Sequence, residues 1–326
     1  MSKEVKVMKN NIKKLQKVNI REYGVVIGFI ILCLIITIAT PNFASHKNIL
    51  NLLRQSSIVG IISAGMTFVI ISGNFDISVG VVAALSGAIT MKFATSGLNI
   101  LPSMLIALTV CAVVGFINGF IVAKINIPSL ITTMAMVSIV KGSMLMLTGG
   151  YPITESIKVL DYIGNGYALG IPFPVIIFAV VVMIAYIILT KTRFGRYVYS
   201  VRGNREASKL NGINVDSYII KVFIINAVLA GIAGIVLIGR MGTASPAAGD
   251  GYDMDAIASV VIGGTSVAGG SGSVLKTVIG VLMMSVINNS FNLLGVDMYF
   301  QYIFKGLIIL FAVGIDSYSK KKLASR

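Results

Sequence analysis

Long uninterrupted apolar runs, such as Val25–Thr40, dominate this chain. A membrane-spanning helix needs about 20 predominantly apolar residues, whereas the strands of a membrane barrel alternate polar and apolar side chains. Composition points the same way, because 56% of the residues are hydrophobic and 12% are charged, against about 45–50% and about 25% in soluble domains. The sequence therefore predicts an all-α, polytopic membrane bundle in contact with lipid, and argues against a soluble enzyme or a nucleic-acid-binding domain.

Glycine, proline, asparagine and charged residues divide the apolar sequence into about ten predicted spans. The segment Ser72–Asp76 joins two of them and is too short for anything but a tight turn, and the eighth span is short and rich in glycine. We therefore expect interrupted helices at both places. The predicted spans are 23–40, 56–73, 77–95, 101–123, 129–148, 171–190, 218–240, 255–268, 273–291 and 299–317.

Lysine and arginine are distributed unevenly around these spans. If the amino end is cytoplasmic, the cytoplasmic segments hold 20 basic residues and the outer loops hold four. The positive-inside rule then fixes the orientation, and it accounts for the net charge of +15 without a nucleic-acid partner. We predict cytoplasmic tails at 1–22 and 318–326 and a transmembrane domain at 23–317.

Three polar clusters lie in or between spans, where polar groups are costly and usually face a cavity or another helix. In Ser72–Gly80, Asp76 could line a path or could cap the following span. In Gly249–Gly272, the glycines do not form a phosphate-binding loop, because the chain contains no Gly-Lys-Ser or Gly-Lys-Thr. Non-helical backbone at membrane depth, either buried in protein or lining a water-filled cavity, is the better interpretation, with Asp255 either capping the eighth helix or facing the path.

The third cluster comprises the asparagines of the ninth span, for which helix packing and path lining both remain open. Lys141 and Lys305 also lie within spans, where we expect them to snorkel or to pair. A metal site is not expected, because Cys33 and Cys111 lie in apolar runs and His46 is the one histidine. The candidate path residues are Asn74, Asp76, Ser78, Asp255, Thr265, Asn288 and Asn289.

The longest predicted cytoplasmic connection is Lys191–Ser217, the loop 191–217. Its polar middle, Asn204–Leu210, can form a short amphipathic helix that Asn204 caps and Gly212 ends. A solvated basic loop is one interpretation, and a surface helix that docks in a partner's groove is the other.

These strings resemble the permease subunits of ribose-type ABC sugar importers. The match runs from the first span to the last, and it is densest in Ser72–Gly80, Thr192–Gly212, Gly251–Gly270 and Asn288–Gly295. The chain departs from the family at Asn74, Phe75 and Lys276. The resemblance implies ten spans in a bacterial cytoplasmic membrane, a second permease subunit, an extracytoplasmic sugar-binding protein, and a separate cytoplasmic ATPase that holds ATP and Mg²⁺. It assigns ATPase coupling to Arg202, Gly203, Asn204, Arg205, Glu206, Ala207, Leu210 and Gly212.

The expected function is transport of a monosaccharide such as ribose, with no catalysis and no cofactor on this chain. An ion-gradient-driven secondary transporter is the alternative, and it would need intramembrane acids to carry the coupling ion. Asp76 and Asp255 are the best candidates for that role. An intramembrane enzyme is disfavoured, because the spans contain no paired acids, no His/Cys cluster and no Ser-His arrangement.

Overall fold

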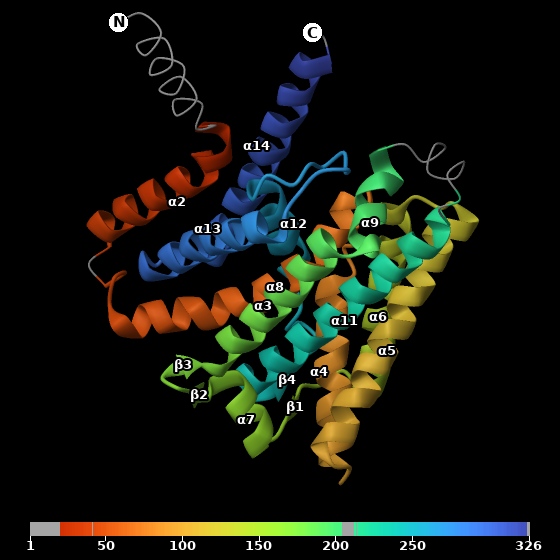
Figure 1. Ribbon diagram of the computed structural model, residues 1–326. Coiled ribbons are helices and arrows are strands. Elements are labelled where there is room, and N and C mark those ends of the chain that lie inside the picture. The colour runs from red at the N-terminus through yellow and green to blue at the C-terminus, as the bar shows by residue number, and fades with distance from the viewer. Residues whose placement is uncertain (1–19, 41, 204–211, 213, 325–326) are drawn as a thin grey trace, which may run out of the picture.

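The computed structural model describes residues 20–324 except 41, 204–211 and 213, and this part is mostly helical (Figure 1). Among the described residues, six helices are long and apolar enough to cross a membrane. They are α3 (His46–Ile71), α5 (Ile100–Phe120) with the π-helical turn η1 (Ile121–Ile125), α6 (Ser129–Thr148), α8 (Phe173–Lys191), α11 (Val215–Met241) and α13 (Val274–Leu293). Three further apolar helices are α2 (Ile20–Ala39), α4 (Val79–Thr95) and α14 (Met298–Ala324).

The predicted helical membrane bundle is confirmed, but ten full spans are not. The eighth predicted span contains only the short helix α12 (Tyr252–Ile262), which ends at Gly263. Helix α3 begins at His46, well before the predicted residue 56, because Ser45 caps it. The Ser45 hydroxyl accepts the Asn48 N–H at 3.3 Å. Polar residues such as Arg54 interrupt the apolar pattern there without interrupting the helix.

The bundle has two distinct ends, which we name after the helices that lie there (Figure 1). The α9 end carries α9 (Arg193–Gly203), the start of α2 and the end of α14. The α7 end carries α7 (Lys158–Asn165) and four two-residue strands. The strands pair antiparallel, β1 (Ile153–Thr154) with β4 (Thr243–Ala244) and β2 (Tyr167–Ala168) with β3 (Ile171–Pro172).

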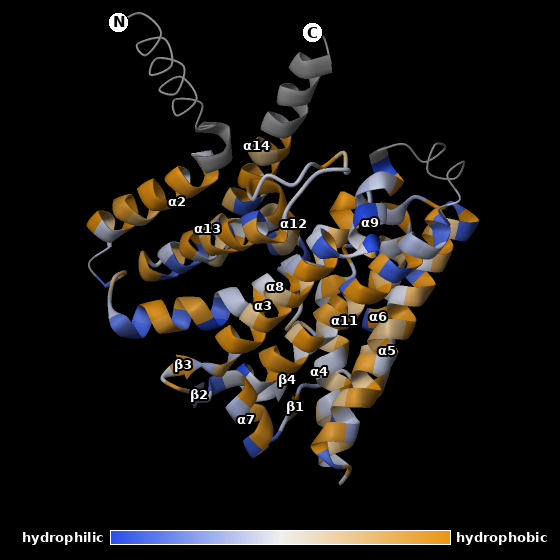
Figure 2. Ribbon diagram, viewed as in Figure 1, coloured by the Kyte–Doolittle hydropathy of each residue, from blue (hydrophilic) through white to orange (hydrophobic). Residues whose placement is uncertain are grey.

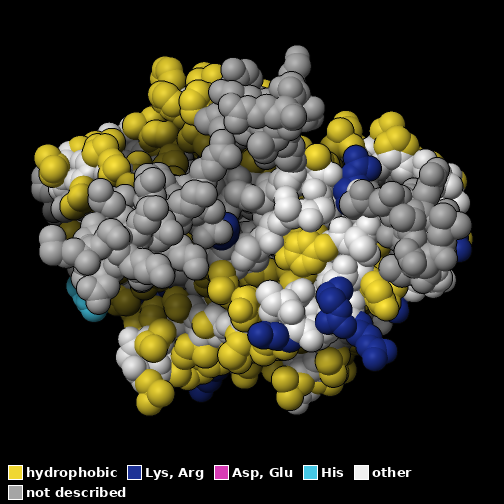
Figure 3. All heavy atoms as spheres, turned by 45° about the horizontal axis from the view of Figure 1, so that its top comes forward, with side chains coloured by type: hydrophobic (Ala, Val, Ile, Leu, Met, Phe, Trp, Pro, Cys, Tyr) yellow, Lys and Arg dark blue, Asp and Glu magenta, His cyan; other side chains and the backbone are white. Residues whose placement is uncertain are grey.

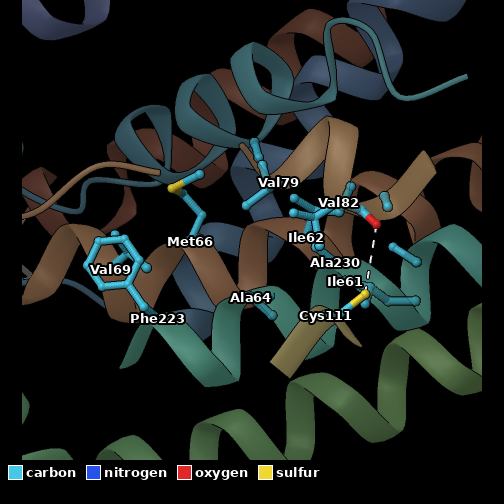
Figure 4. Close-up of a cluster of buried hydrophobic side chains, with 14 of the residues drawn as sticks. Ile61, Ile62, Ala64, Met66, Val69, Val79, Val82, Cys111, Phe223 and Ala230 are labelled. Atoms are coloured by element: carbon cyan, nitrogen blue, oxygen red, sulfur yellow. Dashed lines mark hydrogen bonds between the residues drawn. The ribbon is translucent and has the colours of Figure 1, made fainter. Parts of the chain in front are cut away.

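Helix α11 lies at the centre of the core and packs against α3, α4 and α5. Figure 4 shows Phe223 and Ala230 of this helix among buried side chains of α3, α4 and α5. Small residues permit the close approach: a Cβ atom added to Gly115 would lie 2.6 Å from the Phe223 carbonyl oxygen, and one added to Gly234 would overlap that of Ala83. Helices in lipid associate through such backbone contacts, because hydrocarbon supplies no hydrophobic force between them.

The outer faces of the bundle are apolar. Large hydrophobic side chains remain exposed on α2, α5, α6, α8 and α14, with Ile38 and Met146 more than four-fifths exposed. Figure 2 shows apolar residues along the helices, with hydrophilic residues gathered toward the helix ends and around α9. In a soluble protein such exposed apolar side chains would be unfavourable. In a membrane they contact lipid tails, which are equally apolar, so their exposure costs no free energy.

Candidate translocation and coupling site

Two interrupted helices end in the same way. After α3 and after α12, three successive backbone N–H groups donate hydrogen bonds to the carbonyls four, three and five residues earlier, respectively. The middle residue of each turn is a glycine with positive φ, 81° at Gly73 and 88° at Gly264, a conformation that favours glycine. The donors are Ser72, Gly73 and Asn74 in the first break and Gly263, Gly264 and Thr265 in the second.

The two breaks also contact each other at the α9 end. Gly270 donates its N–H to the carbonyl of Ile71 at 2.8 Å. A Cβ atom added to Gly269 would lie 2.8 Å from the Cα atom of Gly73. The predicted non-helical backbone is therefore present in both segments, and the two segments form one contact although they are far apart in sequence. Parts of the second break, including Gly264 and Ser271, are exposed on the surface of the single chain.

Helix α9 connects to both breaks through two side chains. Arg202 donates from Nε to the Ala268 carbonyl at 3.0 Å, and its aliphatic stem lies against Gly73 and Gly269. The Tyr199 hydroxyl donates to the Gly272 carbonyl at 2.9 Å, and burial raises the pKa of this phenol. A displacement of α9 would therefore act on both breaks at once.

A cavity of about 210 Å³ lies beside this contact. Ser72, Asn74, Ser129 and Arg202 contribute polar groups to its wall, and Asn126, which has φ +62°, also lines it. The predicted path residue Asn74 is only partly buried here. Its amide donates to the Ser72 hydroxyl at 3.1 Å.

The predicted path residues Asp76 and Ser78 lie in a buried hydrogen-bond cluster. One Asp76 carboxylate oxygen accepts the Ser78 N–H at 2.9 Å and the Ser78 hydroxyl at 2.5 Å, and the other accepts the Asn226 amide at 2.9 Å. Asn118 donates to the Ser78 hydroxyl at 3.1 Å. Asp76 does not cap α4, because the N-cap position is Ser78; its carboxylate binds Ser78 and fastens the first break to α11. Sequence reasoning missed Asn118 and Asn226, although a lone amide within an apolar span is itself a signal.

Asp255 and Asn288 belong to a second buried polar cluster. Asp255 does not cap α12; it forms an ion pair with Lys305 of α14 at 2.9 Å, and Asn288 of α13 donates to the same carboxylate at 3.3 Å. The expected pairing of Lys305 is confirmed. Asn289 exchanges two amide hydrogen bonds with Asn48 of α3, at 2.8 and 2.9 Å. These contacts join α3, α12, α13 and α14.

Thr265 is 1% exposed, and its hydroxyl has no hydrogen-bond partner among the described residues. Of the predicted coupling residues, Arg202 and Gly203 end α9, and Gly212 has φ +75°. The others, Asn204, Arg205, Glu206, Ala207 and Leu210, lie outside the described residues.

No cluster of three or more potential metal ligands of the His, Cys, Asp and Glu types occurs within the described part of the chain.

Basic side chains gather at the α9 end. Figure 3 brings the α9 end forward and shows basic side chains on that face, with no acidic side chain among those in colour. The helices that reach this end contribute Lys124, Lys191, Arg193, Arg196, Arg202, Lys221 and Lys276. At the α7 end, Arg54 stacks over the Tyr167 ring at 4.7 Å, and Lys158 begins α7.

The chain is similar to known membrane transport permeases. A protein-family model described as the permease component of branched-chain amino acid transport systems matches residues 48–313. The ribose import permease of Haemophilus influenzae is 42% identical, over 91% of this chain and 94% of the relative. That of Bacillus subtilis is 40% identical, over 91% and 92%. The xylose transport system permease of Haemophilus influenzae is 34% identical, over 95% and 100%.

No solved structure matches the chain. The family model covers most of the sequence, and the relatives align with this chain over nearly their full lengths. The chain itself folds as a helical membrane bundle. The chain therefore belongs to this family of membrane transport permeases.

Proposed function

We propose that this chain is the permease subunit of an ATP-binding-cassette importer and forms the translocation path for a monosaccharide, ribose or a similar sugar. Its similarity to ribose and xylose permeases over the whole chain carries this proposal. The polar groups in its core are mostly amides and hydroxyls, which suit a neutral polyol better than an ion. The acids that an ion-driven transporter would use, Asp76 and Asp255, are both engaged in bonds between helices.

Energy must then reach the permease from outside the chain. The sequence has no phosphate-binding loop, so ATP and Mg²⁺ would be held by a separate cytoplasmic ATPase. Delivery of the sugar would need an extracytoplasmic binding protein, and a second permease subunit, a homodimer partner, would complete the path. These partners follow from the proposed class of importer, and this chain itself would bind no cofactor.

The coupling segment would be Arg202–Gly212 within the loop 191–217. The contacts of α9 support this assignment, because Arg202 and Tyr199 reach both helix breaks from the base of that segment. A displacement of this segment by the ATPase would therefore be transmitted to the two helix breaks, which are in contact with each other. Asn74 and Thr265, one in each break, are the predicted path residues closest to this movement. We retain Asp76, Ser78, Asp255, Asn288 and Asn289 as path candidates that would act only if helices separate.

The topology would comprise ten crossings, nine by apolar helices and one by α12 together with the non-helical segment before it. The α9 end would be cytoplasmic, because basic residues gather there, and both termini would lie on that side. Single cysteines at Lys158 and Ser325 test this in intact cells. Labelling from outside at Lys158 alone supports the orientation, and labelling at Ser325 alone reverses it.

Reconstitution tests the function. The permease, with its ATPase and binding protein in liposomes, should take up ribose only when ATP is enclosed. Ala207→Trp should keep the protein in the membrane yet abolish uptake, because a bulky side chain prevents docking of the coupling segment. Ala324→Trp, near the carboxyl end, is the control. Uptake driven by an ion gradient without ATP would instead establish secondary transport.

A further inference from the structure

A charged pair lies halfway along the bundle, away from the two buried clusters. The Lys141 ammonium of α6 is 3.8 Å from a carboxylate oxygen of Asp250, and the two side chains are 45% and 50% exposed. At about 1.5 Å per residue, Lys141 is about 18 Å along α6 from Ser129 and about 10 Å from Thr148. Both groups therefore lie at the depth of the hydrocarbon core, which is about 30 Å thick.

The backbone that carries Asp250 is not helical. It leaves β4 at the α7 end, turns inward over residues 245–251, and begins α12 at Tyr252. Gly249 fixes its depth by packing against the second residue of α4, since a Cβ atom added to Gly80 would overlap the Gly249 carbonyl oxygen. Non-helical backbone at this depth is tolerated only where it is buried in protein or lines a water-filled cavity.

Burial within the subunit does not satisfy this condition, because Ala247 and Asp250 are exposed. Snorkelling does not satisfy it either: a lysine can extend toward the interface, but the short side chain of Asp250 cannot. The charged pair and the open backbone therefore both require water or the proposed second permease subunit, and not lipid, on the same face of the subunit. Lipid on that face would leave a carboxylate in hydrocarbon.

The chemistry of the pair suits a neutral sugar. The two charged groups are 3.8 Å apart. A charge-assisted hydrogen bond is shorter, at about 2.7–2.9 Å. Because the ammonium and the carboxylate are not held at that distance, each can still form a hydrogen bond with a group of the sugar. An ammonium donates to a hydroxyl oxygen, and a carboxylate accepts from a hydroxyl group. A sugar hydroxyl can do both at once.

We propose that Lys141 and Asp250 line the sugar path at mid-membrane and form a hydroxyl-binding subsite there. This inference rests on the proposed transport of a monosaccharide. The residues would bind the sugar in transit through α6 and the segment 245–251, whereas the buried clusters hold helices together.

The test combines accessibility with transport. Lys141→Cys and Asp250→Cys, in membranes that contain the ATPase and binding protein, are treated with a charged thiol reagent, and reaction is measured above that of the parent with Cys33 and Cys111. Ile139→Cys is the control, on the opposite, apolar flank of α6 and 61% exposed. We expect both test positions to react about tenfold faster than the control, because the reagent does not enter hydrocarbon, and ribose-loaded binding protein with ATP to slow the reaction. Rates equal to the control overturn the proposal.

Ribose uptake then distinguishes a subsite from a merely wet surface. Lys141→Met and Asp250→Asn should each reduce the uptake rate about 10-fold to 100-fold at normal membrane levels, as expected for loss of a hydrogen bond to a charged group. ATP hydrolysis stimulated by the binding protein should persist. Normal uptake in both variants overturns the subsite, as does full recovery in the exchanged variant Lys141→Asp/Asp250→Lys, which would indicate a purely structural pair. Failure of the wild type to take up ribose or xylose would instead refute the proposed function, while the labelling result would stand.

Discussion

Removing Lys305 should destabilise the protein more than removing any exposed lysine. The ammonium lies 2.9 Å from Asp255, and the two side chains are 20% and 10% exposed. In Lys305→Met the carboxylate keeps one donor, the Asn288 amide at 3.3 Å. Loss of one partner of a buried ion pair costs about 3–5 kcal/mol, because the other charge remains buried and uncompensated.

The matched control is Lys124→Met at the α9 end. Lys124 lies 3.3 Å from Asp216, but its side chain is 51% exposed. Exposed pairs of this kind contribute about 0–1 kcal/mol. The double variant Asp255→Asn/Lys305→Met removes both charges, so it should recover most of the lost stability and lie within about 1–2 kcal/mol of the wild type.

Unfolding in mixed micelles of dodecylmaltoside and SDS, followed by helical circular dichroism, gives the differences in free energy of unfolding. Lys305→Met should lose several times more than Lys124→Met. If the two losses agree within about 1 kcal/mol, the Lys305–Asp255 pair is solvated and the reasoning fails. The same conclusion follows if the double variant is less stable than Lys305→Met.

Three further predictions follow from the helix breaks and the amide pair. Gly269→Ala should abolish ribose uptake at normal expression, because its Cβ atom would meet the Gly73 backbone at 2.8 Å, whereas the same change at Gly264 meets open space. Gly264→Ala should therefore lose only about 1–2 kcal/mol of stability, from its positive φ. Arg202→Met should leave ATP hydrolysis but lower the sugar moved per ATP, measured in proteoliposomes, and an unchanged ratio would exclude this link. Asn289→Leu should destabilise the protein by about 0.6–1.7 kcal/mol in SDS titration. Adding the substitution at Asn48 should cost little more, since one substitution already removes both amide bonds; additive losses would contradict the pairing.

The sequence alone determined the helical membrane class of the protein and the positions of several of its helices. Apolar runs and glycine-rich interruptions are local features, so α6 was predicted at its observed bounds and both breaks were placed correctly. The start of α3 was missed, because a capped helix continues through polar residues that hydropathy alone excludes. The family resemblance added the expected partners and the coupling segment.

Only the tertiary structure decided which polar residues meet. Asp76 and Asn226, or Asp255 and Lys305, are far apart in the chain, and their pairing depends on which helix faces pack together. The inward course of residues 245–251 likewise depends on the Gly80–Gly249 contact. Hydropathy predicts which residues lie inside the membrane, but it does not predict whether a given side chain faces another helix, lipid or water. That distinction is set by long-range packing, because every polar group at this depth must be satisfied by whatever group the fold brings to it.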